Sequence, residues 1–301
     1  MKRYTLRWNI EKEDSGKWVR QFLQEQLISK RTLTAIKHDG GFISVNGEEV
    51  NVRYPLKVGE ILKVVFPPER RSEGVIPEEI PVDIIYEDDD ILICDKPAGM
   101  NTIPSGDRPY GNLVNALTSY YEHEEIASTV HIVTRLDRNT SGLVLVAKHR
   151  HVHHLFSLQQ KERGIKRRYE AFAEGCFTNE LGTINKNIGR KESSIIEREV
   201  REDGQYACTH YRVLRQKEHF AHLILQLETG RTHQIRVHLA SIGHPLVGDD
   251  LYGGSLALLS RQALHCVSLG FFHPVQKKWM QFKSMLPSDL SSLLNEQTKR
   301  D

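Results

Sequence analysis

One carboxylate flanked by two arginines is the strongest candidate for chemistry in this sequence. Asp137 lies between Arg135 and Arg138 in the polar segment 131–142. A guanidinium group close to a carboxylate keeps it ionised, which is the state that a nucleophile or a general base requires. The same charges also fit a surface turn between solvated side chains, and the pattern alone leaves both interpretations open.

The residues after this segment predict the element that positions the carboxylate. Residues 143–147 are Leu-Val-Leu-Val-Ala and follow a glycine directly, a pattern typical of a buried strand. The polar segment before the strand is therefore predicted to be a loop held by a rigid element. Such loops are a common place for catalytic groups.

Two later segments place polar residues next to predicted elements. Tyr169 begins a strand predicted over 167–175, where a tyrosine on its own is more often a packing residue. Another strand is predicted at 223–227. It is followed by a helix that we expect to begin near Thr232, an acceptable N-cap, and to end at Gly243. Arginines on such a helix are ordinarily solvated.

Taken together, three motifs in this order resemble those of the RluA-type pseudouridine synthases, which isomerise uridine in structured RNA. The motifs are Arg-Leu-Asp-x-x-Thr-Ser-Gly at 135–142, a basic residue, a variable residue and a tyrosine at 167–169, and Thr-Gly-Arg-x-His-Gln-Ile-Arg-x-His at 229–238. The resemblance extends over roughly residues 80 to 285. It departs from the family pattern at Thr134, where the family usually has histidine.

The resemblance implies a role for each matching residue. Asp137 would be the catalytic carboxylate, Arg236 its partner, and Tyr169 the ring that stacks on the target base. Arg135 would fill the space that the flipped-out nucleotide leaves. Further RNA contacts are expected from Lys96 in the Lys-Pro-x-Gly loop, Arg231 and His233. The alternative role is packing near the site for Lys96, and holding the loop for Arg231 and His233.

The chemistry of this family needs one ionised carboxylate at the sugar. The C–N glycosidic bond breaks, the base rotates, and a C–C bond forms through C5, with nothing hydrolysed overall. The carboxylate can attack C1′ as a nucleophile or remove a proton from C2′, and the sequence does not choose between these routes. Because no step needs a metal or a redox partner, we expect no cofactor and no metal ion.

A histidine-rich stretch after the catalytic segment invites a metal interpretation. Residues 148–168 hold four histidines, with seven Lys or Arg against one Glu, on a helix predicted to end before Gly164. His149 and His153 are helical neighbours, but no acidic or cysteine partner accompanies them, and a basic neighbourhood repels a cation. We predict a surface that faces a polyanion instead.

The first 66 residues predict a small separate unit. Two short helices are followed by a hairpin whose signal is the Asn46-Gly47 turn between apolar runs. The unit resembles an S4-type RNA-binding domain. The resemblance implies that Lys30, Arg31 and Lys37 present positive charge to phosphate oxygens. A solvated helix face is the alternative for these cations.

Composition limits how and where the chain can bind partners. The formal net charge is +2 over 301 residues, so nucleic-acid binding must come from local patches. The four cysteines form no Cys-x-x-Cys pair, which fits a reducing cytosol better than a disulfide framework or a zinc site. No apolar run approaches the roughly 20 residues of a membrane span. We expect a soluble cytoplasmic monomer without a membrane partner.

We predict an α+β chain whose function is carried by its second domain. The parts are an S4-like domain at 1–66, a flexible linker at 67–80, a catalytic domain with a mixed, mostly antiparallel sheet at 81–290, and a polar tail at 291–301. The predicted function is an RNA pseudouridine synthase acting on large-subunit ribosomal RNA, with transfer RNA as the alternative substrate. Two other classes stay open: a non-catalytic S4-type RNA-binding or ribosome-assembly factor, and an N-glycosidase, which would need a second carboxylate or a water-activating base.

Overall fold

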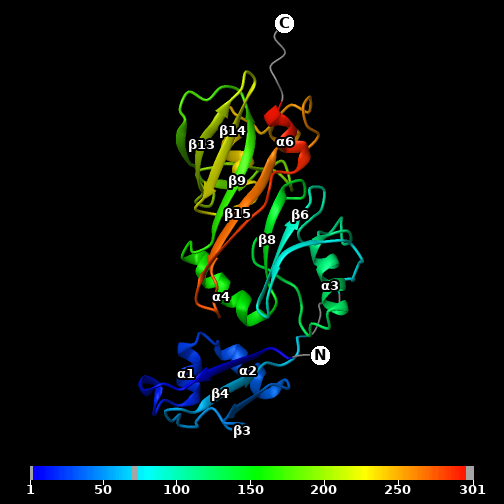
Figure 1. The fold of residues 1–301 in the computed structure, drawn as a ribbon. Coiled ribbons are helices and arrows are strands. Elements are labelled where there is room, and N and C mark those ends of the chain that lie inside the picture. The colour runs from blue at the N-terminus through cyan, green and yellow to red at the C-terminus, as the bar shows by residue number, and fades with distance from the viewer. Residues whose placement is uncertain (1–2, 70–73, 296–301) are drawn as a thin grey trace.

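The computed structural model describes residues 3–69 and 74–295. Figure 1 shows the N-terminal residues (blue) as a small body next to a larger, elongated body that holds the rest of the chain. Each body has its own hydrophobic core, one built from buried residues between Ile10 and Phe66 and the other from residues beginning at Ile91. No helix in the described ranges is long and apolar enough to cross a membrane.

The N-terminal body is a four-stranded antiparallel sheet with two helices. Its elements are β1 (Thr5–Asn9), η1 (Lys12–Asp14), α1 (Val19–Glu25), α2 (Lys30–His38), β2 (Phe42–Val45), β3 (Glu48–Glu49) and β4 (Ile61–Val65), with strand order β1-β4-β2-β3. The predicted hairpin turn is present, and both Asn46 and Gly47 have positive φ angles of 51° and 93°. This is the turn geometry that Asn-Gly favours. The two predicted helices and the hairpin are therefore confirmed.

The larger body is organised around one sheet that is antiparallel at all but one strand pairing. Its strands are β5 (Asp83–Glu87), β6 (Ile91–Lys96), β7 (His131–Ile132), β8 (Ser141–Ala147), β9 (Lys166–Glu174), β10 (Leu181–Asn185), β13 (Cys208–Gln216), β14 (Phe220–Leu227), β15 (Leu264–Phe272) and β16 (Trp279–Lys283). The main order is β10-β13-β14-β9-β15-β8-β6-β5, with β16 paired to β15 and β7 to β8. Only β15 and β8 run parallel. The predicted mixed, mostly antiparallel α+β fold is confirmed.

Short helices and one small hairpin complete the larger body. They are α3 (Leu113–His123), α4 (Arg150–Lys161), β11 (Ile188–Arg190), β12 (Arg198–Val200), α5 (Gln234–Ala240), η2 (Asp250–Tyr252) and α6 (Ser288–Asn295). In Figure 1, α4 lies at the end of the sheet that is nearest the N-terminal body. Because α4 ends at Lys161, the helix predicted to end before Gly164 is confirmed. Residues 185–205 contain the β11–β12 hairpin.

Gly142 fixes the start of the strand that follows the predicted catalytic segment. It pairs with Cys266 where β8 and β15 run side by side, and its φ angle is 114°. A Cβ atom at this position would lie 2.5 Å from both the backbone nitrogen and the backbone oxygen of Cys266. Only glycine allows this backbone conformation and this close approach. The end of the catalytic loop is thereby locked to the centre of the sheet.

Two histidines of the predicted polyanion-facing stretch lie between the two bodies instead. The ring of His149 stacks on Tyr4 at a centroid distance of 3.8 Å, and His151 stacks on Phe66 at 5.5 Å. The Tyr4 hydroxyl also donates to the Asp90 carboxylate at 2.9 Å. Burial lowers the pKa of both histidines to about 4, so the rings are neutral. For these two histidines the predicted surface role was wrong, because they are buried packing residues.

The segment predicted as a flexible linker is anchored on both sides of the four residues outside the described ranges. The Glu69 carboxylate accepts a hydrogen bond from the Arg150 backbone N–H at 2.7 Å. Further along, the Asn115 side chain donates to the Ile76 carbonyl at 2.7 Å. Glu78 accepts from the Gly111 backbone N–H at 2.6 Å. The described parts of the segment are therefore tied to the larger body.

The predicted polar tail at 291–301 begins too early. Residues up to Asn295 belong to α6, whose Leu290 and Leu293 are buried beside Phe172 and Phe220. The sequence did not indicate this helix because only polar residues separate its two buried leucines. The segment therefore has the composition of a polar tail. Residues 296–301 lie outside the described ranges.

Candidate active site

The loop that carries Asp137 is held by hydrogen bonds from both sides. The Thr102 hydroxyl donates to the Leu136 carbonyl at 2.7 Å and accepts from the Leu136 N–H at 3.1 Å. The Thr134 hydroxyl accepts from the Leu145 N–H on β8 at 2.9 Å. Thr134 is buried, so the residue that departs from the family pattern serves here to tie the loop to the strand.

Lys96 supports this loop from the interior. Its ammonium group donates to the carbonyl oxygens of Pro97 and Met100 at 2.8 Å each, and to that of Arg138 at 3.1 Å. Burial lowers the pKa of Lys96 to about 7, against the opposing charge of Asp137. Its exposed fraction is 0%. Of the two predicted roles, the enclosure of the ammonium by carbonyls favours packing near the site over RNA contact.

Arg236 lies between two carboxylates. Its Nη1 atom is 3.4 Å from Asp137 Oδ2, while Nε and Nη2 donate to the two oxygens of Asp249 at 2.7 Å each. The guanidinium also lies over the Tyr252 ring, 4.9 Å from its centroid. Asp249 therefore orients Arg236, which leaves one guanidinium nitrogen for Asp137. Among the described residues, none hydrogen-bonds the Oδ1 atom of Asp137.

Arg236 and its two carboxylate partners form a partly buried group in which opposite charges stabilise one another. Burial alone would lower the pKa of Arg236, but the hydrogen bond and charge of Asp249, followed by the charge of Asp137, raise it overall. The Arg236 side chain is 7% exposed and that of Asp137 is 25% exposed. The Asp137 carboxylate is thus open to a ligand on one side and faces a fixed positive charge on the other.

His233 approaches the same carboxylate from the turn before α5. The Tyr252 hydroxyl accepts from the Arg198 N–H at 2.9 Å and forms a hydrogen bond with His233 Nδ1 at 2.8 Å. The other ring nitrogen, Nε2, lies 4.0 Å from Asp137 Oδ2. Burial lowers the pKa of His233, against the charge of Asp137.

The helix after this motif begins later than predicted. His233, with a φ angle of 55°, is the residue before α5, and the helix starts at Gln234. Thr232 is therefore not the N-cap. The side chain of Gln234 accepts from the Arg231 N–H at 3.0 Å and from the Thr229 hydroxyl at 2.7 Å, and these bonds shape the turn.

Tyr169 lies at the base of the site, on β9. It lines a small recess together with Asp137, Arg236 and the apolar side chains of Leu227, Ile235 and Leu264. Burial raises the pKa of Tyr169 well above its ordinary value, so the phenol stays protonated. The recess offers an aromatic face within the same small space as the carboxylate.

Above the recess lies an open cavity of about 870 Å³ with a basic lining. Its cations are Arg135, Arg138, Lys161, Arg163, Arg167 and Arg231. Arg135 is exposed, and no residue of the described ranges hydrogen-bonds its side chain. Arg231 donates through Nε to the Tyr206 carbonyl at 3.0 Å and so both holds a loop and lines the cavity. A strongly basic cavity around an anionic side chain suits a polyanionic ligand.

The cations predicted on the N-terminal body are exposed on α2. Lys30 and Lys37 line one groove together with Arg20 and Arg53, whereas Arg31 does not reach it. Positions 30 and 37 share a helix face, and position 31 lies about a quarter of a turn further round. The structure thus brings two of the three predicted cations together, in a groove separate from the active-site cavity.

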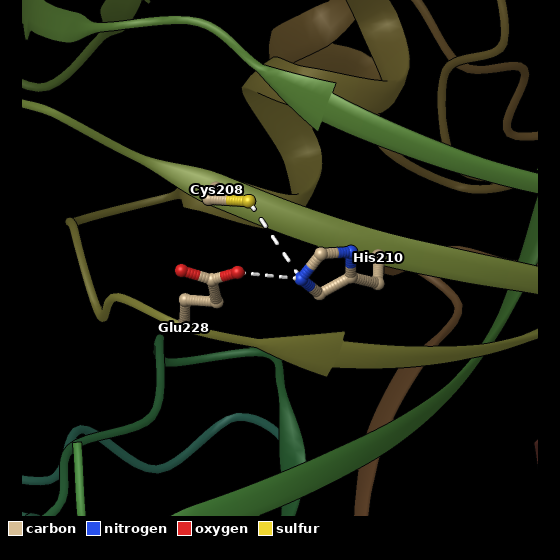
Figure 2. Close-up of side chains that lie close together, drawn as sticks. All are labelled: Cys208, His210 and Glu228. Atoms are coloured by element: carbon tan, nitrogen blue, oxygen red, sulfur yellow. Dashed lines mark hydrogen bonds and ion pairs between the residues drawn. The ribbon is translucent and has the colours of Figure 1, made fainter.

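Two groups in the described ranges have the donor types of a metal site, Cys208 with His210 and Glu228, and Asp88 with Asp90 and His273. Figure 2 shows the first, in which His210 Nε2 lies 2.8 Å from the Glu228 carboxylate. The hydrogen bond from His210 lowers the pKa of Glu228. The ionised carboxylate only accepts, so Nε2 carries the proton.

The remaining contacts leave both histidines without a free lone pair. The Thr183 hydroxyl lies 2.9 Å from His210 Nδ1 and donates to it. In the second group, His273 Nδ1 accepts from the N–H groups of Val275 and Gln276 at 3.2 and 2.9 Å. Its proton is then on Nε2, facing Asp88 at 3.2 Å. The first group is complete as a hydrogen-bonded cluster. In the second, the His273 Nε2 proton faces Asp88 without a hydrogen bond. A metal would have to displace a histidine proton in each group.

Comparisons with known proteins agree with this arrangement. The family described as RNA pseudouridylate synthase matches residues 90–241. The uncharacterized RNA pseudouridine synthase YjbO of Bacillus subtilis (strain 168) is 47% identical, covering 92% of this chain and 98% of that protein. The ribosomal large subunit pseudouridine synthase D of Yersinia pestis is 39% identical, covering 84% and 82%. The solved structure of human RNA pseudouridylate synthase domain containing 1 is similar in fold, with a TM-score of 0.58 and 24% identity over 70% of this chain and 85% of that one.

The chain therefore belongs to the RNA pseudouridylate synthase family, and within it to the RluA type. It is an RNA pseudouridine synthase, an isomerase. The residues that sequence motifs did not assign to the site are Asp249, Tyr252 and Thr102, which orient Arg236, His233 and the catalytic loop.

Proposed function

We propose that this enzyme isomerises specific uridines in large-subunit ribosomal RNA. The observation that carries the proposal is the pair of Asp137 and Arg236 in a recess that shares part of its lining, Asp137 included, with a cavity rich in arginines. Relatives that are 34% to 39% identical over most of the chain carry the name ribosomal large subunit pseudouridine synthase D. The substrate class of those relatives is the basis for naming ribosomal RNA here.

The geometry suits a uridine that has left its stack and entered the recess. The base lies against Tyr169, and the sugar faces the Oδ1 atom of Asp137. The carboxylate either attacks C1′ or takes the proton from C2′, and in both routes the bond from C1′ to N1 breaks. The uracil rotates on the Tyr169 face and bonds C1′ through C5, which loses its proton while N1 gains one. Arg236 keeps the carboxylate charged and oriented throughout.

Arg135 is suited to the RNA side of this event. Its guanidinium is exposed at the edge of both the recess and the cavity, without a described partner that would have to be displaced. We infer that it occupies the position which the flipped nucleotide leaves, at a step whose unstacking costs a few kcal/mol. Arg231 and His233 border the same space.

The N-terminal body supports binding at a distance from the chemistry. We propose that residues 1–66 are an S4-type RNA-binding domain and that 81–290 form the catalytic domain. Lys30 and Lys37, with Arg31 beside them, would contact RNA phosphates. The contacts of Tyr4 and Phe66 with the larger body hold this domain in a defined orientation. We further propose that the enzyme acts as a cytoplasmic monomer.

Mapping pseudouridine across total RNA tests this proposal. Cells that lack the protein are complemented with the wild-type chain or with Asp137→Asn. We expect one or more large-subunit ribosomal uridines to lose the modification and only the wild-type chain to restore it. Loss at transfer-RNA sites alone would replace the substrate, and an unchanged map would favour a non-catalytic RNA-binding factor.

A further inference from the structure

Arg163 and Tyr206 form an exposed surface at the rim of the active-site cavity, with the guanidinium over the ring. Arg163 lies two residues after the end of α4, and Tyr206 lies two residues before β13. The guanidinium carbon of Arg163 lies 5.7 Å from the centroid of the Tyr206 ring. Both residues line the cavity that contains Asp137. Tyr206 is 41% exposed and the Arg163 side chain 53% exposed, so a ligand can reach both.

This surface is supported from behind by the cluster in Figure 2. The Glu228 carboxylate forms an ion pair with Arg163 through one oxygen and accepts from His210 at 2.8 Å through the other. Arg231 donates to the Tyr206 carbonyl and fixes the backbone on which the ring stands. Three segments far apart in the sequence therefore converge to hold one cation and one ring in place.

The charge of Arg163 is already paired, and this decides what the surface can bind. An arginine that neutralises a phosphate contributes through its net charge, which Glu228 largely cancels at this position. What stays available is the exposed part of the guanidinium and of the tyrosine ring, on the sides that do not face each other. Unstacked bases bind to faces of these two kinds in RNA recognition.

We propose that Arg163 and Tyr206 bind, by stacking, a nucleobase that neighbours the target uridine in the RNA, with Glu228 as the positioning residue. This rests on the proposed function, because a uridine that flips into the recess leaves its neighbours partly unstacked. A base held at the rim stabilises that opened state. The surface thereby favours RNA in which an unpaired nucleotide lies beside the target.

Salt-dependent binding distinguishes stacking from a phosphate contact. The probe is unmodified large-subunit ribosomal RNA transcribed in vitro, and the parent protein is Asp137→Asn, so that no turnover occurs. Tyr206→Ala is expected to weaken binding about tenfold, within the range measured for one stacked base, and to leave the slope of log affinity against log salt unchanged. Tyr206→Phe keeps the ring and should restore affinity to within about twofold.

Two further variants complete the test. Lys161→Met removes an exposed cation of the same cavity and should reduce the salt slope by about 0.7 to 0.9, as one phosphate contact does. Glu228→Gln releases Arg163 and also removes a negative charge from the cavity. It should therefore reduce the affinity ratio between the proteins with Tyr206 and with Tyr206→Ala, whatever its effect on overall affinity. Thermal unfolding of each variant excludes a folding defect.

The stacking proposal is overturned if Tyr206→Ala binds as tightly as the parent, or if Tyr206→Phe loses as much affinity as Tyr206→Ala. It is also overturned if Arg163→Ala lowers the salt slope as Lys161→Met does, since that result assigns Arg163 to a phosphate. The wild-type chain is assayed for pseudouridine on the same transcript. A wild-type chain that leaves the transcript unmodified contradicts the proposed substrate, whatever the binding variants show.

Discussion

Asp249 holds Arg236 with two hydrogen bonds of 2.7 Å, both shorter than the 3.4 Å contact that Arg236 makes with Asp137. The side chain of Asp249 is 0% exposed, so it never meets the RNA. The arginine beside the catalytic carboxylate is thus oriented by a second carboxylate from behind. Under the proposed function, the active site has two acidic residues with different tasks, Asp137 to react and Asp249 to position Arg236.

Asp249→Asn tests this division directly. The amide keeps the shape but loses one acceptor and the negative charge, so Arg236 is no longer fixed from both sides. We expect turnover to fall about tenfold or more, equal to at least about 1.4 kcal/mol of transition-state stabilisation, with RNA affinity unchanged. Single-turnover rates and binding to ribosomal RNA measure the two effects. The control is Asp250→Asn, an exposed neighbour that should change neither. Normal turnover by Asp249→Asn would mean that Asp137 alone orients Arg236.

Lys96→Met separates packing from RNA contact. The variant removes the donor for three carbonyl oxygens, and each buried acceptor left unpaired costs about 1 to 3 kcal/mol. We expect a clear loss of stability in urea unfolding, and normal RNA affinity for the protein that stays folded. The matched control is Lys161→Met, which makes the same change at an exposed cation of the cavity. That variant should lose affinity and keep its stability. The reverse result for the pair would return Lys96 to the RNA surface.

The two buried histidines between the bodies predict a loss of stability in acid. Their folded-state pKa values of about 4 lie below the unfolded value of about 6.5. As pH falls from about 6.5 to about 4, the unfolded chain binds protons that the folded chain does not. Each histidine then removes up to about 1.4 kcal/mol per pH unit from the free energy of unfolding.

His151→Phe tests this prediction with little other change. Its Nδ1 atom has no hydrogen-bond partner in the described ranges, and a phenyl ring keeps the stacking on Phe66. We expect the difference in urea midpoint between pH 5 and pH 7.5 to become smaller in the variant than in the wild-type chain. An identical acid dependence in both proteins would show that other groups control it.

The fold class and the order of the motifs could be predicted from the sequence because local patterns carry them. The apolar run after Gly142 predicts the central strand, and the Asn46-Gly47 turn predicts the hairpin. Arg236 was placed beside Asp137 by the resemblance, and the structure brings the two side chains together. These features depend on few residues that are close in sequence or belong to one motif.

What could not be predicted depends on contacts between distant segments. Lys96 is enclosed by carbonyls from its own loop and from Arg138. In the sequence it is only a basic residue before a proline, and nothing local predicts that it is buried. Asp249 lies 13 residues after Arg236, and only the turn of the chain after α5 brings it back. His149 and His151 look solvated in their basic stretch until the N-terminal body covers them.

Asp137→Asn on purified protein tests the central claim most directly. With enzyme in excess over an unmodified large-subunit ribosomal RNA transcript, the wild-type chain should convert its target uridine to pseudouridine. The variant should bind the transcript with similar affinity and form no pseudouridine above background, because an amide can neither attack C1′ nor take the C2′ proton. Loss of a covalent or basic catalyst lowers the rate by more than about tenfold. If Asp137→Asn forms pseudouridine at a rate within about tenfold of the wild-type chain, the catalytic role of Asp137 is contradicted.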